Sequence, residues 1–168
     1  LCVIFMRKFM GKKGRNQHDA SSDNTFVAEY QVSNPAIFGK TIMEIRKNAD
    51  CHFVISRIWK NEKVIIPTSD TVIEKDEHLL VISGKSDVER VKTLFGHKEN
   101  IDWNKKDIDW NAIDSQLVSR KVLVTKPELN GVKLGSLKLR NSYGINITRV
   151  NRAGIDLLPS RYGRYILL

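Results

Sequence analysis

The pattern of apolar and polar positions in residues 34–67 recurs, without a gap, 92 positions later in residues 126–159. Each copy predicts a short amphipathic helix, an alternating strand, a turn and a second short strand. The residues that match across the copies are Pro35 with Pro127, Gly39 with Gly131, Arg57 with Arg149 and Pro67 with Pro159. A fixed spacing of this kind is typical of an internal repeat, so the sequence predicts two tandem modules of the α+β class that should superpose.

The first module is predicted over residues 25–96. Alternating apolar positions predict its leading strand at 25–32, and apolar residues three and four apart predict a helix at 41–48. After the repeated segment we expect a closing strand at 78–83 and a second helix at 87–95, which a glycine ends. In the loop before the closing strand, Val72 and Ile73 are both expected to be buried.

The second module is predicted over residues 116–168, after a linker at 97–115. It repeats the leading strand, the helix and the hairpin, but after Pro159 it holds only the start of a closing strand and no second helix. Its sheet should therefore have an open edge, which a partner chain or the first module would cover. The simplest solution is a twofold homodimer. In both modules the alternation slips by one near Ile58 and Val150, which predicts a bulge.

Residues 1–24 contain a six-residue apolar run and then a basic, polar segment. Six residues cannot span a bilayer, which needs about 20. One interpretation is the cytoplasmic end of a membrane helix, because basic residues collect on that side. The other is a strand or helix that belongs to the soluble fold. The basic residues are Arg7, Lys8, Lys12, Lys13 and Arg15.

The net charge of +9 is unevenly distributed along the chain. Residues 25–96 hold ten basic and ten acidic side chains, whereas residues 116–168 hold ten basic and two acidic. A basic module can bind nucleic acid, but here the charges are scattered and no nucleic-acid-binding motif is present. An acidic neighbouring surface or anionic lipid headgroups explain the same charge, so we expect no nucleic acid partner.

The sequence contains no recognisable catalytic constellation. Its four histidines and two cysteines show no spacing typical of a metal site. The Gly-Lys-Thr at residues 39–41 lacks the upstream glycine of a P-loop, and no dinucleotide-binding fingerprint follows a strand. We therefore predict a protein that is not an enzyme and that holds no metal or cofactor.

The candidate ligand-binding residues are Arg57, Arg149, Asn151 and Asp70. The two arginines occupy equivalent places near the ends of strands, and a guanidinium can hold a carboxylate or phosphate through two parallel hydrogen bonds. The alternative is structural: each arginine pairs with a carboxylate of the chain, such as Asp70 or Asp156. The two interpretations stay open at this point.

Several stretches of the first module, NPAIFGKT, VIIPTSDTVI and KDEHLLVISG, resemble the TrkA-C (RCK-C) domain. This small ligand-sensing module is attached to potassium channels and to several bacterial transporters. The resemblance covers residues 26–96 in full and 117–168 in part. The second copy, GVKLGSLKLRNSYGINITRVNRAGIDLLPS, is similar to the second such domain of the aspartate–alanine exchanger family of bacterial membrane transporters.

The resemblance implies a membrane-proximal regulatory region that lies between two membrane halves of a transporter, at the cytoplasmic face of the bacterial inner membrane. It also implies that residues 1–24 are the end of a membrane segment followed by a basic linker. Its expected partners are the transmembrane domains of the same transporter, a small-molecule or ion ligand, and a second copy in a homodimer. The expected activity is regulation of transport, with potassium and other cations or antiport as the associated processes. The alternative function is a dimerisation or scaffolding domain that binds no ligand.

Overall fold

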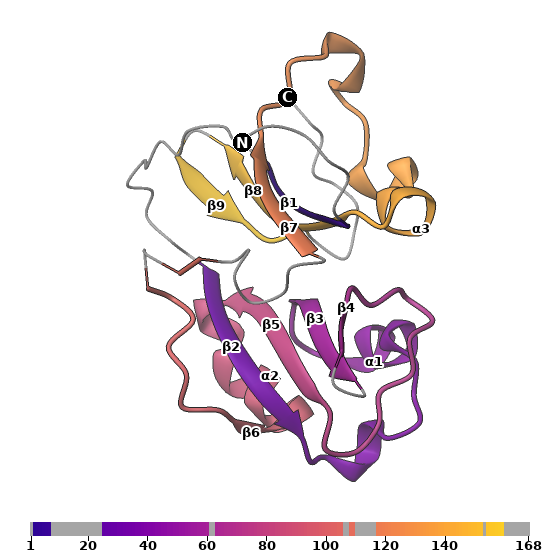
Figure 1. The fold of residues 1–168 in the computed structure, drawn as a ribbon, viewed down its shortest axis with the longest axis vertical. Coiled ribbons are helices and arrows are strands. Elements are labelled where there is room, and N and C mark those ends of the chain that lie inside the picture. The colour runs from indigo at the N-terminus through magenta and orange to yellow at the C-terminus, as the bar shows by residue number, and fades with distance from the viewer. Residues whose placement is uncertain are drawn as a thin grey trace. The chain divides into compact units, whose positions relative to one another are not determined.

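The computed structural model describes residues 2–7, 25–60, 63–105, 108–109, 117–152 and 154–159. The chain divides into two compact units. The central unit is Thr25–Ile108, and the terminal unit combines Leu1–Asn24 with Asp109–Leu168. Each unit contains one antiparallel sheet and short helices, which confirms the predicted α+β class (Figure 1).

The sheet of the central unit has the strand order β4-β3-β5-β2-β6, with every neighbouring pair antiparallel. The strands are β2 (Thr25–Val32), β3 (Phe53–Lys60), β4 (Lys63–Ile65), β5 (His78–Gly84) and β6 (Gly96–Lys98). The leading strand has the predicted bounds, and the closing strand is one residue longer than predicted. Strand β6 extends into the segment expected to be a linker, so the central unit continues beyond residue 96.

Two α-helices and two 3₁₀ turns complete the central unit: η1 (Pro35–Ile37), α1 (Ile42–Asn48), η2 (Lys85–Asp87) and α2 (Val88–Phe95). Helix α1 begins with a capping box, in which Glu44 N donates to Thr41 Oγ1 and Thr41 N donates to the Glu44 carboxylate. Helix α2 ends at Gly96, whose φ is 119°. A Cβ there would lie 2.9 Å from the backbone nitrogen of Ser33, so the close approach of the two backbones requires glycine.

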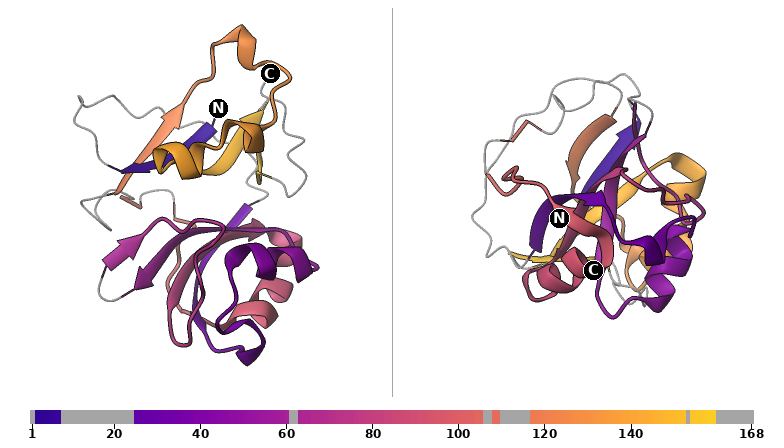
Figure 2. Two further views of the ribbon diagram at one scale, coloured as in Figure 1. Left: turned by 90° about the vertical axis from the view of Figure 1, so that its right-hand side faces the viewer. Right: turned by 90° about the horizontal axis from the view of Figure 1, so that it is seen from below.

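Both helices of the central unit pack on one face of its sheet (Figure 2). Alternate residues of the strands supply the sheet side of this core, because successive side chains of a strand point to opposite faces. The core residues are Ala28, Tyr30, Val32, Ile37, Ile42, Ile45, Ala49, Cys51, Phe53, Ile55, Ile58, Ile73, Leu79, Val81, Val91 and Phe95. The expectation for the loop was half wrong: Ile73 is buried, but Val72, which forms a backbone bridge with Thr41, is 38% exposed.

The sheet of the terminal unit has the strand order β7-β1-β8-β9. Its elements are β1 (Cys2–Arg7), β7 (Leu117–Val122), η3 (Pro127–Leu129), η4 (Leu134–Leu137), α3 (Leu139–Tyr143), β8 (Asn146–Arg152) and β9 (Ile155–Leu157). The predicted helix of the second copy is split in two at Lys138, which has a left-handed backbone (φ 46°). The fragments are too short to bury a continuous apolar stripe, and none of their residues is fully buried.

A shift of 92 residues carries η1 onto η3 and β4 onto β9 with matching bounds. It also carries the cross-strand pair Ile58–Ile65 onto Val150–Leu157. The order β4-β3-β5-β2 in the central unit corresponds to β9-β8-β1-β7 in the terminal unit. Strand β1, drawn in indigo in Figure 1, therefore holds the place that β5 holds in the central unit.

The two sheets also share an irregularity at the same place. The ladder between β3 and β5 leaves out Ser56, and the ladder between β8 and β1 leaves out Thr148, the counterpart of Ser56. The slip predicted near Ile58 and Val150 is therefore a bulge that lies two residues earlier in each strand. A bulge of this kind increases the local twist and changes which face the following side chain occupies.

The apolar run near the N-terminus is a strand in this structure, the second of the two interpretations of the sequence. It pairs with β7 on one side and with β8 on the other. An uninterrupted apolar run suits a strand with neighbours on both sides as well as it suits the end of a helix. Within the described ranges, no helix is both long enough and apolar enough to cross a membrane.

Candidate functional site

Arg57 lies on the face of the central sheet that is opposite to the helices. Its cross-strand neighbour on β5 is Leu80, and the neighbour of Leu80 on β2 is Glu29. We call these three residues the central row. Because Ile58 and Leu79 face the helices, the central row faces the other way. Arg57 is 0% exposed and Glu29 is 8% exposed, so the row brings a buried base and a buried acid onto one strip of the sheet.

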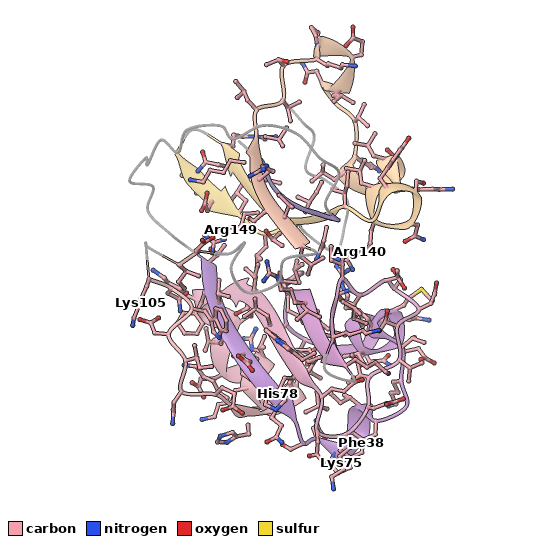
Figure 3. The ribbon with its side chains drawn as sticks, in the orientation of Figure 1. Phe38, Lys75, His78, Lys105, Arg140 and Arg149 are labelled. Atoms are coloured by element: carbon pink, nitrogen blue, oxygen red, sulfur yellow. The ribbon has the colours of Figure 1, made fainter. Side chains whose placement is uncertain are left out.

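His78 holds the carboxylate of Glu29 in place. Its Nδ1 atom lies 3.0 Å from Glu29 Oε1 and 3.9 Å from Glu99 Oε1. His78 is labelled in Figure 3. The signal for the cluster was the charged residue Glu29 within β2, but its partner lies 49 residues away and could not be inferred from spacing.

The segment after β6 packs against the central sheet. Trp103 contacts Trp59 with ring centroids 6.4 Å apart. The side-chain amide of Asn104 accepts a hydrogen bond from Val27 N and donates one to Val27 O, both at 2.9 Å. Trp103 and Asn104 thus hold this segment against the sheet.

In the terminal unit, Arg149 takes the place of Arg57. Its cross-strand neighbour on β1 is Val3, and the neighbour of Val3 on β7 is Lys121. We call these residues the terminal row. Arg149 Nη1 lies 3.6 Å from Asp156 Oδ2, and Asn151 Nδ2 donates to Asp156 Oδ1 at 2.7 Å. Arg149 is labelled in Figure 3. The carboxylate of Asp156 thus brings together two of the predicted site residues.

The two rows differ in charge at one position. Glu29 in the central row corresponds to Lys121 in the terminal row, so an acid is replaced by a base. The central row has one base and one acid, whereas the terminal row has two bases and draws its acid from Asp156. The side chain of Arg149 is 22% exposed, in contrast to the fully buried Arg57. The terminal row therefore has the charge and the access that a small anion requires.

Asp70 does not lie with Arg57. It is exposed and belongs to a turn that packs on helix α1, where Met43 N donates to Ser69 O and Ile42 N donates to Thr71 O. Helix α1 covers the face of the sheet opposite to the central row. Within the central unit the structure therefore separates Asp70 from Arg57, and within the terminal unit it brings Arg149 and Asn151 together through Asp156.

A second charged cluster closes the loop before β5. Lys60 Nζ lies 3.0 Å from Glu77 Oε1 and 3.4 Å from Glu74 Oε1, and hydrogen bonding to Glu77 raises the pKa of Lys60 above its ordinary value. The other oxygen of Glu77 accepts from Glu74 N. Since Glu77 is buried and both its oxygens are engaged, this cluster holds the loop against β3 and has a structural role.

In the described part of the chain, no three metal-binding side chains converge on one point. Cys51 is a buried free thiol, and burial raises its pKa, which disfavours the reactive thiolate. The side chains of Arg149, Lys121 and Asn151 carry a guanidinium, an ammonium and an amide. These groups are hydrogen-bond donors that can bind carboxylate or phosphate oxygens.

An antiparallel sheet with two helices on one face makes the central unit a small α+β module. Residues 27–96 match the TrkA-C domain. This segment of the chain is therefore similar to the TrkA-C domain, as the resemblance of its motifs implied.

The chain is also similar to curated proteins described as uncharacterized transporters. It is 52% identical over 165 residues to one from Bacteroides thetaiotaomicron, which matches 95% of this chain. It is 46% identical over 161 residues to one from Porphyromonas gingivalis, which matches 96% of this chain. The chain spans 29% of the length of each of these two relatives.

Solved structures of RCK domains are similar to part of the chain. One is the RCK_C domain dimer of S. agalactiae BusR in complex with c-di-AMP, which is 24% identical, with a TM-score of 0.38, and covers 43% of this chain and 91% of its own. Another is the GsuK RCK domain, which is 27% identical, with a TM-score of 0.38, and covers 48% of this chain and 18% of its own.

Proposed function

We propose that this chain is a regulatory region of a bacterial membrane transporter of the aspartate–alanine exchanger type, and that it works at the cytoplasmic face of the inner membrane. The observation that carries the proposal is the extent of the similarity: relatives described as transporters match 95% or more of the chain, beyond the TrkA-C domain at residues 27–96. The terminal unit then serves as a second TrkA-C-like module, which its strand order under the shift of 92 residues supports.

The regulatory signal in this proposal is a small anion that binds at the terminal row. Arg149 and Lys121 provide charge, Asn151 provides an amide, and Asp156 orients Arg149 and Asn151 until the ligand competes for them. Arg57 is the equivalent residue of the central unit, but it is fully buried and would need the face around it to open. The regulated process is transport by the membrane domains of the same protein, including potassium, other cations or antiport.

The second candidate function is a dimerisation or scaffolding domain without a ligand. The ion pair between Arg149 and Asp156 favours it, because the arginine already has a carboxylate partner. A structural role of this kind predicts that no small anion stabilises the chain. The homodimer belongs to both candidates and does not distinguish them.

Thermal unfolding of the purified chain with nucleotides, amino acids, phosphate and monovalent cations tests the ligand proposal. An anion present at 100 times its Kd should stabilise the folded state by about 2.7 kcal/mol. Arg149→Gln should remove this stabilisation, whereas the matched control Lys126→Gln, an exposed base of the same unit, should retain it. If no compound shifts the unfolding temperature, the scaffolding alternative is the better account. If both variants lose the shift equally, the anion does not bind specifically at the terminal row.

The transporter proposal has a separate test in the full-length protein. Apolar spans of about 20 residues should flank this region on both sides. Reconstituted into vesicles, the protein should transport with a rate that depends on the ligand found by thermal unfolding, and Arg149→Gln should abolish that dependence while leaving basal transport intact. A gene without such spans would contradict the proposal.

A further inference from the structure

Strand β1 fills a slot in the sheet of the terminal unit. It pairs antiparallel with β7 through six register pairs and with β8 through four. In the sequence, however, the whole central unit lies between β1 and these two strands. The slot, which we define as the inner edges of β7 and β8, thus takes its middle strand from a distant part of the chain.

The slot specifies the register of its occupant. In the central unit Leu79 lies between Tyr30 and Ile58, and in the terminal unit Cys2 lies between Val122 and Val150, the residues that correspond to Tyr30 and Ile58. The same correspondence holds for the next three residues of β1 and β5, on both sides and across the shared bulge. Strand β1, which comes from a different place along the chain than β5, therefore pairs with its two neighbours in the same register as β5 does.

What the slot recognises is mainly backbone. Strand addition obtains its affinity from main-chain hydrogen bonds, while the alternating side chains set the specificity. The occupant must be a short apolar segment without proline, because both of its edges donate and accept in the sheet. The sequence of β1, CVIFMR, meets these conditions. An empty slot would leave two strand edges without hydrogen-bond partners, which favours pairing with another strand.

We infer that the slot is an interaction surface for a second copy of this chain, and that the Cys2–Arg7 segment of one copy can occupy the slot of another to give a dimer by strand exchange. The contacts are the same within one chain and between two chains, since the sequence of the segment is the same. The balance is then decided by the concentration of the chain, because the segment of a second copy competes with the segment that is covalently joined to the slot. The inference rests on the sheet alone and is independent of any ligand or transporter.

A mixture of two variants tests the exchange directly. One chain carries Cys2→Ser, Cys51→Ala and Val122→Cys, and the other carries only Cys51→Ala and an affinity tag that changes its mass. Opposed residues on neighbouring strands are close enough for a disulfide. Since Val122 is 37% exposed, the substitution should not disturb folding. A disulfide between Cys2 and position 122 can then form only between two different chains.

The two chains are mixed, refolded together at a high concentration of about 1 mM, which favours association between chains, and oxidised gently. Non-reducing electrophoresis and peptide mass spectrometry should show a Cys2-to-122 heterodimer. Its yield should be about tenfold above that of the control with Ser119→Cys in place of Val122→Cys, because Ser119 pairs with Phe5 and lies out of reach of Cys2.

A third chain, which keeps Cys2 and carries Cys51→Ala and Val122→Cys, tests whether the same disulfide forms within one molecule. If it forms the disulfide only within one molecule, and the mixture gives no heterodimer above the Ser119→Cys control, β1 belongs to its own chain and the exchange is overturned. If the disulfide forms neither within nor between chains, the register of the slot itself is overturned. Soluble monomer by sedimentation confirms that each variant used in the comparison folds.

Discussion

The two sheets share their strand order and differ in what closes and covers them. In the central unit the middle strand is β5, which leads directly into helix α2, and sixteen buried apolar residues connect sheet and helices. In the terminal unit the middle strand is β1. Among the residues whose burial is described there, the buried ones are Leu117, Asn146, Thr148 and Val150, two of them polar. The same backbone pairing and the same bulge thus define the strand register in both sheets. The layer of helices, which covers the central sheet, accounts for the larger number of buried apolar residues there.

The largest difference between the units should appear in their cores. Ile58 and Val150 occupy the same register position and are 0% and 6% exposed. Ile58→Ala should lower the free energy of unfolding of the central unit by about 3–4 kcal/mol. Val150→Ala should cost the terminal unit about 1–2 kcal/mol. Hydrogen exchange measures each unit separately, with Met43→Ala, at an exposed site, as the control. Equal costs at the two positions would contradict the comparison.

The next largest effect should come from the charged cluster of Lys60, Glu74 and Glu77 in the loop before β5. Glu77→Gln removes the buried carboxylate that Lys60 contacts, and should lower the free energy of unfolding of the central unit by about 2 kcal/mol. The surface pair of Lys75 with Asp76 is the matched control, and Asp76→Asn should cost less than about 0.5 kcal/mol. Urea unfolding followed by tryptophan fluorescence measures both. A similar loss for both variants would argue against a special role of Glu77.

The third largest effect should be a dependence of the stability of the central unit on pH. Burial, together with the nearby Glu89 and Cys51, raises the pKa of Tyr30 to about 12. Because a tyrosine in the unfolded chain titrates near 10, the stability is complete below about pH 10 and is lost as the pH rises toward 12, by on the order of 2 kcal/mol. Tyr30→Phe should remove this dependence, whereas Tyr143→Phe, at an exposed site, should not. Denaturant unfolding between pH 8 and 11 checks it, and an unchanged slope in Tyr30→Phe would refute the assignment.

The smallest effect should be the same in both units. Gly39 and Gly131 have φ values of 71° and 82°, which an L-residue adopts only with strain. Each substitution by alanine should cost about 1 kcal/mol in its own unit, since nothing lies within 4 Å of a Cβ at Gly39 and the strain is in the backbone. Gly135→Ala, in open space without a positive φ, is the control. Unequal costs at Gly39 and Gly131, measured by hydrogen exchange, would show that the turns before the helical segments of the two units are not equivalent.

The sequence predicted the elements of the central unit well because their signals are local. Ile42 and Ile45, three residues apart, indicate the first helix, and Gly96 indicates the end of the second. The strand β1 could not be placed, since periodicity identifies an apolar segment but not the distant edges that it joins. The residues of the N-terminal run therefore left two interpretations open, and only the resemblance favoured the end of a membrane segment.

The candidate site was predicted in part for the same reason. The repeat pointed to Arg57 and Arg149, and Asn151 was found beside Arg149 through Asp156. The neighbours across the sheet, Glu29 and Lys121, were missed because rows of a sheet combine residues from different strands. Asp70 was grouped with Arg57 on charge alone, and the packing of its turn on helix α1 separates the two.

The lengths of the outer strands have a consequence for solubility. Strands β4, β6 and β9 have three residues each, so each offers few backbone groups to another molecule. Asn104 further occupies the edge of β2 beyond β6. The six-residue β7 is the longer outer edge, and it carries the exposed bases Arg120 and Lys121, whose like charges oppose edge-to-edge stacking. Concentrated solutions of the chain should therefore resist fibril formation, and neutralising those two bases is the change that would most weaken this protection.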